Sequence, residues 1–397
     1  MKRMKRNYFI YIFIFWYMAK IICSTTFETI GGIPVDTVSS MINYLVLVLL
    51  VIQMVFFQSY GQKEFVIIAV VSIPFLITAA VSRSFSLLSG WMFVVAAKDT
   101  SFEKIIKTVY RALLFTIFLV FVLYSCNILE DYTMVRGGAI RHSLGFSHPN
   151  QLGVRMFQLI ACHCYLHRHK MRAVDYGIAA AAAAFVYIVP NSQSSCMCIV
   201  VLALLLAIGR LLEKNKEGML SFYGKGLTAA AALFNILSVL LSVIDVKSHD
   251  VLRQIDVWMS YRFSHSFEVL QVYGIPLWGQ KVFLMEEERQ KMGMMDGAGR
   301  LYLDNAYMSL FIKYGIVSYL IFSVAYLVLM NDCRKKKRYF TVSILFVYAL
   351  YGIMENAVFM MSHNIFLLAF AGMMYERLSK IKDKKLCLKI QRQYKGL

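Results

Sequence analysis

The chain has 397 residues, and its composition excludes an ordinary soluble domain. Hydrophobic residues make up 59% of it and charged residues only 16%, and the mean hydropathy is +0.60. Soluble domains carry about 25% charged residues, so these values indicate an integral membrane protein. The formal net charge of +19 then reports on membrane topology and not on nucleic acid, because Lys and Arg collect in cytoplasmic loops.

Apolar windows long enough to cross roughly 30 Å of hydrocarbon recur along nearly the whole chain. These runs are continuous and do not alternate with period two, which indicates helices and not a β-barrel. We therefore predict an all-α, polytopic integral membrane protein with about 12 transmembrane helices in a single membrane domain, residues 1–397. The predicted helices run near residues 8–24, 41–58, 65–81, 85–97, 112–128, 150–166, 174–190, 196–212, 227–244, 305–330, 339–356 and 364–375.

Basic residues predict the topology of the chain. They cluster before the first helix, in alternate loops and in a tail at residues 376–397, so the positive-inside rule places both termini in the cytoplasm. The first helix follows a basic start, as in a signal peptide. However, it lacks a small-residue cleavage site, and Lys20, Ile21 and Ile22 come before Cys23. We expect it to remain as an uncleaved helix.

The segment from Arg141 to Gly153 concentrates polar residues at a predicted membrane boundary, in and after an external loop at residues 129–149. Its candidate ligand-binding residues are Arg141, His142, His148, Asn150 and, further along the chain, Arg155. We expect Pro149 at the first position of the next helix, so that free backbone N–H groups there would face an anion. Arg155 would lie deeper in a spanning segment, where an ionised residue indicates function. Alternatively, its side chain extends to the headgroup region.

The longest connection, residues 245–303, is predicted to lie outside and to fold as a helical cap. Its apolar residues recur at helical spacing. Arg262 interrupts this apolar side and is expected to point down toward the bundle; alternatively, it pairs with Asp256 or Glu268. A folded external cap over a bundle favours an extracytoplasmic reaction or binding site.

Carboxylates follow at two further places near the outer boundary. Asp304 ends the cap loop and is well placed to cap the next helix, which alone would explain its presence. Glu355 lies in a short external turn before the last helix, with His363 and Asn364 nearby. A carboxylate this close to hydrocarbon needs a partner, and the external arginines are the expected ones.

We predict neither a metal nor a cofactor. His142 and His148 have no cysteine or second carboxylate at ligand spacing. His163, His167 and His169 are interpreted as a solvated basic face, and the cysteines as small apolar side chains within the bundle. The sequence contains no Gly-rich loop that ends in Gly-Lys-Ser/Thr, so no nucleotide site is indicated.

Three features together resemble the Wzy-type polysaccharide polymerases, which are related to the O-antigen ligases. They are the Arg141–Gly153 segment, the stretch Tyr273–Gln280 and the helix start at Asp304-Asn305. In this superfamily the large external loop ends in His-Asn, nine residues and Gly-x-x-Gly/Thr/Tyr. Here the same place reads Asp304-Asn305, nine residues and Gly315-Ile316-Val317-Ser318. The spacing agrees and two residue types differ, which puts in doubt any role that needs a histidine at Asp304.

The resemblance implies a metal-independent membrane glycosyltransferase of the C type. Its reaction would transfer the growing glycan from undecaprenyl diphosphate to the sugar of an incoming lipid-linked repeat unit, at the outer face of the bacterial cytoplasmic membrane. Expected partners are that lipid-linked oligosaccharide, membrane lipid, a chain-length regulator and a flippase. The expected catalytic residues are Asp304, Glu355 and His148, one of them as the base. The expected diphosphate- or substrate-binding residues are Arg141, Arg262, Arg155, Asn150, His142, Asn305 and Tyr307.

The residues fit this chemistry independently, because breaking a sugar–diphosphate bond develops negative charge that arginines stabilise without a metal. Three alternatives stay open. They are transfer of finished polymer to another acceptor, as in the O-antigen ligases, a flippase or transporter of lipid-linked oligosaccharide, and a non-catalytic scaffold. Transporters usually place ionisable residues near the midplane and often show internal repeats, whereas here the charges lie at the boundary and the two halves show no repeat.

Overall fold

The computed structural model describes residues 2–215, 217–294, 297 and 299–379, and nearly all of its regular structure is helical. The helices are α1 (Lys2–Ile22), α2 (Val35–Phe56), α3 (Gln62–Ser82), α4 (Ser86–Ala96), α5 (Phe102–Ser125), α6 (Pro149–His167), α7 (Ala173–Ile188), α8 (Gln193–Asn215), α9 (Glu217–Val243), α10 (Asp250–Trp258), α11 (Arg262–Tyr273), α12 (Glu286–Lys291), α13 (Ala306–Lys313), α14 (Gly315–Lys335) and α15 (Tyr339–Tyr351). Short 3-10 helices are η1 (Val246–Ser248), η2 (Asn356–Phe359) and η3 (Ile365–Leu368), and residues 369–379 form a last helix. Two antiparallel hairpins pair β1 (Thr29–Ile30) with β2 (Ile33–Pro34) and β3 (Met134–Arg136) with β4 (Ala139–Arg141). The predicted all-α class is confirmed.

Six of the described helices are long and apolar enough to cross a membrane: α2, α3, α5, α8, α9 and α14. Shorter apolar helices lie at Tyr8–Ile22, Ser86–Ala96, Ala173–Ile188 and Tyr339–Tyr351. On α2 and α3, large apolar side chains such as Val55, Phe56 and Val70 are exposed, an arrangement that suits lipid better than water. The fold therefore fits a membrane protein, while about twelve spans stay a prediction.

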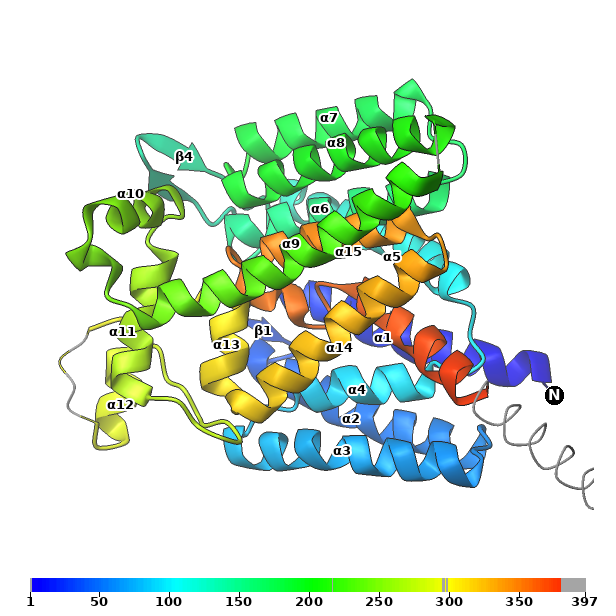
Figure 1. The fold of residues 1–397 in the computed structure, drawn as a ribbon. Coiled ribbons are helices and arrows are strands. Elements are labelled where there is room, and N and C mark those ends of the chain that lie inside the picture. The colour runs from blue at the N-terminus through cyan, green and yellow to red at the C-terminus, as the bar shows by residue number, and fades with distance from the viewer. Residues whose placement is uncertain (1, 216, 295–296, 298, 380–397) are drawn as a thin grey trace, which may run out of the picture.

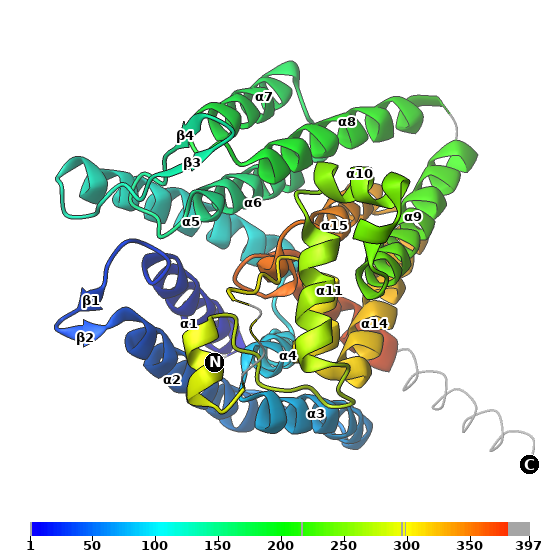
Figure 2. The same ribbon diagram turned by 90° about the vertical axis from the view of Figure 1, so that its left-hand side faces the viewer.

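The long helices run side by side, with α15 in the middle of the bundle (Figure 1). The side chains of α15 from Thr341 to Ala349 are all buried, as expected for a helix that is apolar on every side. Helices α10, α11 and α12 and the β3–β4 hairpin lie at one end of the bundle (Figures 1 and 2). The N-terminus and the end of the last described helix lie at the opposite end (Figure 1). Residues 245–303, the predicted cap, thus occupy the end remote from both described termini.

The predicted helix over residues 305–330 is wrong, because the chain breaks into α13 and α14 at Gly315. Gly315 has a φ of +87°, which L side chains rarely adopt, and a Cβ there would lie 2.6 Å from the carbonyl oxygen of Leu277. Backbone hydrogen bonds from Ile316 to Pro276 (3.0 Å) and from Gln280 to Lys313 (3.1 Å) hold the two segments together. Two parts of the motif that carries the family resemblance therefore meet at a tight backbone contact.

Two other boundaries differ from the predicted ones. Helix α5 begins at Phe102, where a helix near 112–128 was expected, because Ser101 caps it and Ile105, Ile106 and Val109 face the core. The predicted helix at 364–375 begins as η3 and continues as α-helix to residue 379. Residues 380–397 of the predicted basic tail lie outside the described residues.

Candidate functional site

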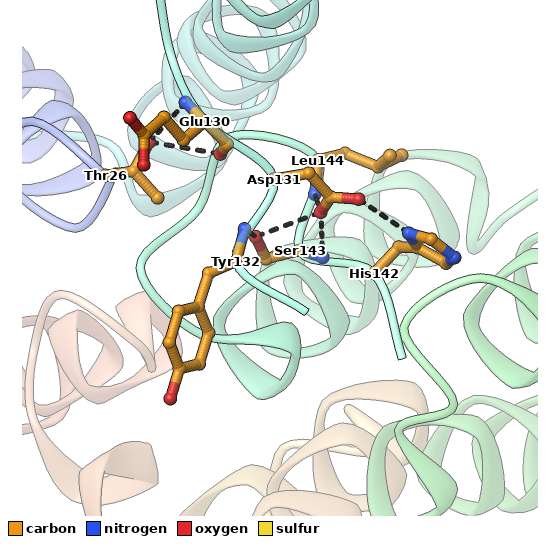
Figure 3. Close-up of polar contacts among 7 residues, drawn as sticks. All are labelled: Thr26, Glu130, Asp131, Tyr132, His142, Ser143 and Leu144. Carbon is orange, nitrogen blue, oxygen red and sulfur yellow. Dashed lines mark hydrogen bonds and ion pairs between the residues drawn. The ribbon is translucent and has the colours of Figure 1, made fainter. Parts of the chain in front are cut away.

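Asp131 orders the loop that carries the first polar motif. Its Oδ1 accepts hydrogen bonds from the backbone N–H groups of Ser143 (2.8 Å) and Leu144 (3.0 Å), and its Oδ2 lies 2.5 Å from Nδ1 of His142 (Figure 3). Although partial burial acts to raise it, the hydrogen bonds from His142 and from the two backbone groups hold the pKa of Asp131 below its usual value. His142, a predicted substrate ligand, therefore belongs to the internal bonding of this loop.

Replacing Asp131 by asparagine is expected to lower the free energy of unfolding by about 1–3 kcal/mol, because a charged acceptor of several hydrogen bonds is lost. The measurement is the thermal midpoint of the purified protein, together with the rate of proteolysis within residues 129–149. Glu130→Gln is a matched control, since the hydrogen bonds between Glu130 and Thr26 use only the backbone of Glu130 (Figure 3). Equal stability of the two variants would contradict this role of Asp131.

Arg141 ends β4 and is only 4% exposed. Its Nε donates to the carbonyl of Pro190 at 2.9 Å, and its Nη2 donates to Oδ1 of Asn150 at 2.5 Å. In the described part of the chain, no carboxylate forms an ion pair with Arg141. Because a guanidinium has five N–H donors, this buried cation keeps the capacity to bind an anion.

His148 is the N-cap of α6, with Pro149 at the first helical position as predicted. Its Nδ1 accepts the backbone N–H of Asn150 at 3.0 Å, and its carbonyl accepts that of Gln151 at 2.9 Å. The expectation of free N–H groups is wrong at these two positions, because His148 satisfies them. Burial lowers the pKa of His148, and the charge of Arg141 lowers it further. The lowered pKa favours the neutral ring, and because Nδ1 accepts the hydrogen bond from Asn150, the proton of the neutral ring is on Nε2.

Glu355 lies between α15 and η2 and is connected to Arg141 through Asn150, whose Nδ2 donates to Oε2 of Glu355 at 3.4 Å. Burial raises the pKa of Glu355 to about 7, and the charge of Asp304 raises it too, whereas Arg262 and Arg141 lower it. Asp304 is itself half-buried, and it forms no hydrogen bond or ion pair with any residue that the structure describes. A carboxyl group with a pKa near 7 can accept and release a proton at neutral pH.

Arg262 brings a second buried guanidinium to this place from the cap. It is the first residue of α11 and is 6% exposed. Its Nε donates to the carbonyl of Met354 at 2.6 Å, directly before Glu355, and its Nη1 donates to the carbonyl of Met259 at 3.0 Å. The side chain thus points down to the bundle and fixes α11 to the turn that carries Glu355.

The alternative pairing of Arg262 with Asp256 or Glu268 is wrong. Asp256 is buried and accepts the backbone N–H of Phe263 at 2.9 Å, which stabilises the start of α11. Glu268 pairs with Lys247 at 2.7 Å on the exposed side of the cap. Both carboxylates are occupied elsewhere, and Arg262 has no ion-pair partner among the described residues.

The cap residue of α13 is Asn305, and the prediction of Asp304 as the cap is wrong. Oδ1 of Asn305 accepts the backbone N–H groups of Tyr307 (3.0 Å) and Met308 (3.3 Å). The hydroxyl of Tyr307 donates to the carbonyl of Ala349 at 2.7 Å, and both side chains are buried. Asn305 and Tyr307, two predicted substrate ligands, therefore use their polar atoms for hydrogen bonds inside the bundle. The carboxylate of Asp304 forms no hydrogen bond or ion pair with a described residue.

Arg155 does not join Arg141 and Arg262. It is 1% exposed, so the alternative in which its side chain extends to the headgroup region is wrong. Its Nη1 donates to the carbonyl of Ser362 at 2.6 Å, and its Nη2 lies 3.5 Å from Nε2 of His363. The structure places this cation with a different set of residues from the other two arginines.

One group of described residues has the geometry to hold a metal ion: His163, His167 and Asp175, whose ligand atoms lie within 4.8 Å of one another. Nε2 of His163 lies 2.9 Å from Oδ1 of Asp175, and Nδ1 of His163 lies 3.3 Å from the hydroxyl of Tyr110. The interpretation of a solvated face is wrong for His163, which is buried, and holds for His167 and His169, which are exposed. The His163–Asp175 contact joins α6 to α7.

Comparison of the chain with protein-family models, with curated proteins and with solved structures found no match. The functional argument therefore depends on the geometry of the chain itself.

Four segments that are distant in sequence meet at the candidate site. The first contributes Arg141, His148 and Asn150, and the other three contribute Arg262, Asp304 and Glu355. Two buried cations, which have no ion-pair partner in the described part of the chain, flank a carboxyl group whose pKa is about 7. Such a set can bind an anion and move a proton. Sequence reasoning missed Asp131, although a carboxylate a few residues before a polar hairpin is a recognisable signal.

Proposed function

We propose that this chain is a polymerase of lipid-linked polysaccharide repeat units, as the Wzy-type family that it resembles would suggest. It would transfer the growing glycan from undecaprenyl diphosphate to the sugar of an incoming lipid-linked unit. The reaction would take place at the outer face of the bacterial cytoplasmic membrane, with both termini in the cytoplasm, for capsule or exopolysaccharide synthesis. The observation that carries the proposal is the pair of buried guanidiniums of Arg141 and Arg262 beside Glu355, neither of which forms an ion pair with any described residue.

In this reaction an acceptor hydroxyl oxygen forms a bond to the anomeric carbon of the donor, and the bond from that carbon to the diphosphate oxygen breaks. The leaving diphosphate stays on its lipid and gains negative charge. Arg141 and Arg262 would stabilise that charge, because preorganised donors in a desolvated site act strongly on developing charge. No metal or other cofactor is needed for this step.

Glu355 would accept the proton of the acceptor hydroxyl. A pKa of about 7 makes its ionised form a stronger base than an ordinary carboxylate and still leaves it substantially populated at neutral pH. Asp304 would keep this pKa high through its own charge. His148, neutral and with Nδ1 already accepting a hydrogen bond, would donate from Nε2.

Cells that lack the protein test the proposal against its alternatives. We expect single lipid-linked repeat units to accumulate at the outer face, because units are exported but not joined. Long unattached chains would indicate a ligase instead, and units retained at the inner face would indicate a flippase. Normal polymer in these cells would contradict any of the three functions.

A further inference from the structure

A polar cavity of about 310 Å³ lies between α1, α2, α4 and residues 357–363. Its polar lining includes Lys20, Asn43, Arg83, Ser86, Ser362 and His363. Lys20 lies in the last turn of α1 and Arg83 directly follows α3. This volume is at the lower end of the range of small-ligand sites, about 300–1,000 Å³, and is large enough for a phosphate or diphosphate group.

The cavity holds positive charge without a carboxylate. Lys20 donates to the hydroxyl of Ser39 at 2.7 Å and forms no ion pair with a described residue. The side chain of Arg83 forms no hydrogen bond or ion pair with any part of the chain that the structure describes. No Asp or Glu is among the described lining residues; Asp36, whose charge acts on Lys20, does not line the cavity. An anion would therefore meet two available cations.

A third cation lies behind the cavity wall. Arg155 contacts Ser362 and His363, which both line the cavity. It also donates to Gln158 at 3.3 Å, but its Nε has no hydrogen-bond partner in the structure, and no described carboxylate pairs with it. A guanidinium buried at 1% exposure without a counter-charge is costly, and an anion in the adjacent cavity would offset that cost.

The mouth of the cavity indicates where the anion comes from. Tyr44 and Phe85 line it, are exposed, and pack edge to face with ring centroids 5.6 Å apart. Tyrosine, as at position 44, is enriched at the boundary between headgroups and hydrocarbon in membrane proteins. The outer sides of α2 and α3 beside them are apolar and exposed, as at Leu45 and Leu76. A lipid tail could therefore lie along these helices while its headgroup occupies the cavity.

We propose that the cavity lined by Lys20, Arg83 and His363 binds the phosphate or diphosphate headgroup of a membrane lipid. It would be a second anion site, separate from the one at Arg141 and Arg262. The two sites are adjacent, because Asn150 bonds to Arg141 and to Glu355 while the next residue, Gln151, lies 3.2 Å from His363. In the proposed polymerase reaction the second lipid is the acceptor. This identification of the lipid rests on the proposed function, whereas the existence of the binding site does not rest on it.

Calorimetric titration of the full-length protein in detergent micelles with farnesyl diphosphate, a short polyprenyl diphosphate, tests the site. We expect two molecules to bind per wild-type chain and one to bind to the Lys20→Gln/Arg83→Gln variant. We also expect one to bind to Arg141→Gln/Arg262→Gln, and two to Arg253→Gln, a control on the exposed side of α10. In the cavity variant, the site at Arg141 serves as an internal check of folding.

Binding of two molecules to the Lys20→Gln/Arg83→Gln variant would overturn the proposal. It would also be overturned if the wild-type protein bound only one molecule and the Arg141→Gln/Arg262→Gln variant bound none. Lys20→Arg/Arg83→Lys keeps both charges and should restore the second molecule. Inorganic pyrophosphate is expected to bind the cavity at least tenfold more weakly than farnesyl diphosphate, and equal affinity would contradict a lipid ligand. If the wild-type protein makes no polymer, and one bound molecule is lost in Lys20→Gln/Arg83→Gln, the proposed function is contradicted and the cavity site is still supported.

Discussion

Replacing Arg141 by alanine is expected to abolish long polymer and to leave single lipid-linked repeat units. Arg141 is 4% exposed and has no ion-pair partner in the described structure, so its charge is available to an anion, which in the proposed reaction is the leaving diphosphate. Removing one preorganised donor from such a site lowers the rate by about 10²–10³-fold, which is enough to prevent repeated addition. The measurement is the distribution of glycan chain lengths on a gel, at matched protein levels in the membrane.

Two further variants make the result at Arg141 specific. Arg262→Ala should give the same product pattern, because the charges of Arg262 and Arg141 both act on Glu355, and both are proposed to stabilise the leaving diphosphate. Arg253→Ala is the control, since Arg253 is exposed and pairs with Asp250 in the preceding turn of α10. Normal chain lengths in Arg141→Ala, with the control also normal, would contradict a role for Arg141 in holding the diphosphate.

The rate of the purified protein is expected to rise with pH and to level off above about 7, the pKa to which Glu355 is raised. In the proposed mechanism the ionised carboxylate is the base, so each pH unit below that value should lower the rate about tenfold. Glu355→Gln should lower the rate about 10²–10⁴-fold. It should also abolish the rise in rate with pH below about 7, the pH limb that Glu355 produces. Initial rates of glycan transfer between pH 5 and 9, with saturating lipid-linked substrate, provide the measurement.

The variant Asp304→Asn distinguishes the proposed roles of Asp304 and Glu355. The charge of Asp304 raises the pKa of Glu355, so its removal should shift the pH limb to lower pH while activity persists. If Asp304 were the base instead, Asp304→Asn would lose activity at every pH and Glu355→Gln would keep the limb. That pattern would reverse the roles given to these two residues.

Apolar windows predict the helices well because a spanning helix needs a continuous apolar run, and each predicted window contains helix in the structure. Where the prediction failed, a local contact decided the outcome. Gly315 breaks a predicted helix because residues 276–280 pack against its backbone. Asn305 caps α13 in place of Asp304 because its amide oxygen reaches two N–H groups. Both contacts are invisible to a hydropathy window.

At the candidate site, too, the sequence indicates which residues are unusual but not which residues they contact. The unusual residues, Arg141, Arg262 and Glu355, could be selected from the sequence, because charges near hydrocarbon are costly without a function. Their partners could not, since Asn150 meets Glu355 across 205 positions of the chain. For the same reason Arg155 could be selected as functional, but its place beside His363 and not beside Arg141 required the fold.

The most direct measurement is the product pattern of the purified full-length protein incubated with a lipid-linked repeat unit in detergent. The account predicts a ladder of products that differ by one repeat, with undecaprenyl diphosphate released in an amount equal to the linkages formed. It also predicts no ladder from Arg141→Ala or Glu355→Gln. A substrate that stays unchanged with the folded wild-type protein, or an equal ladder from these variants, would contradict it.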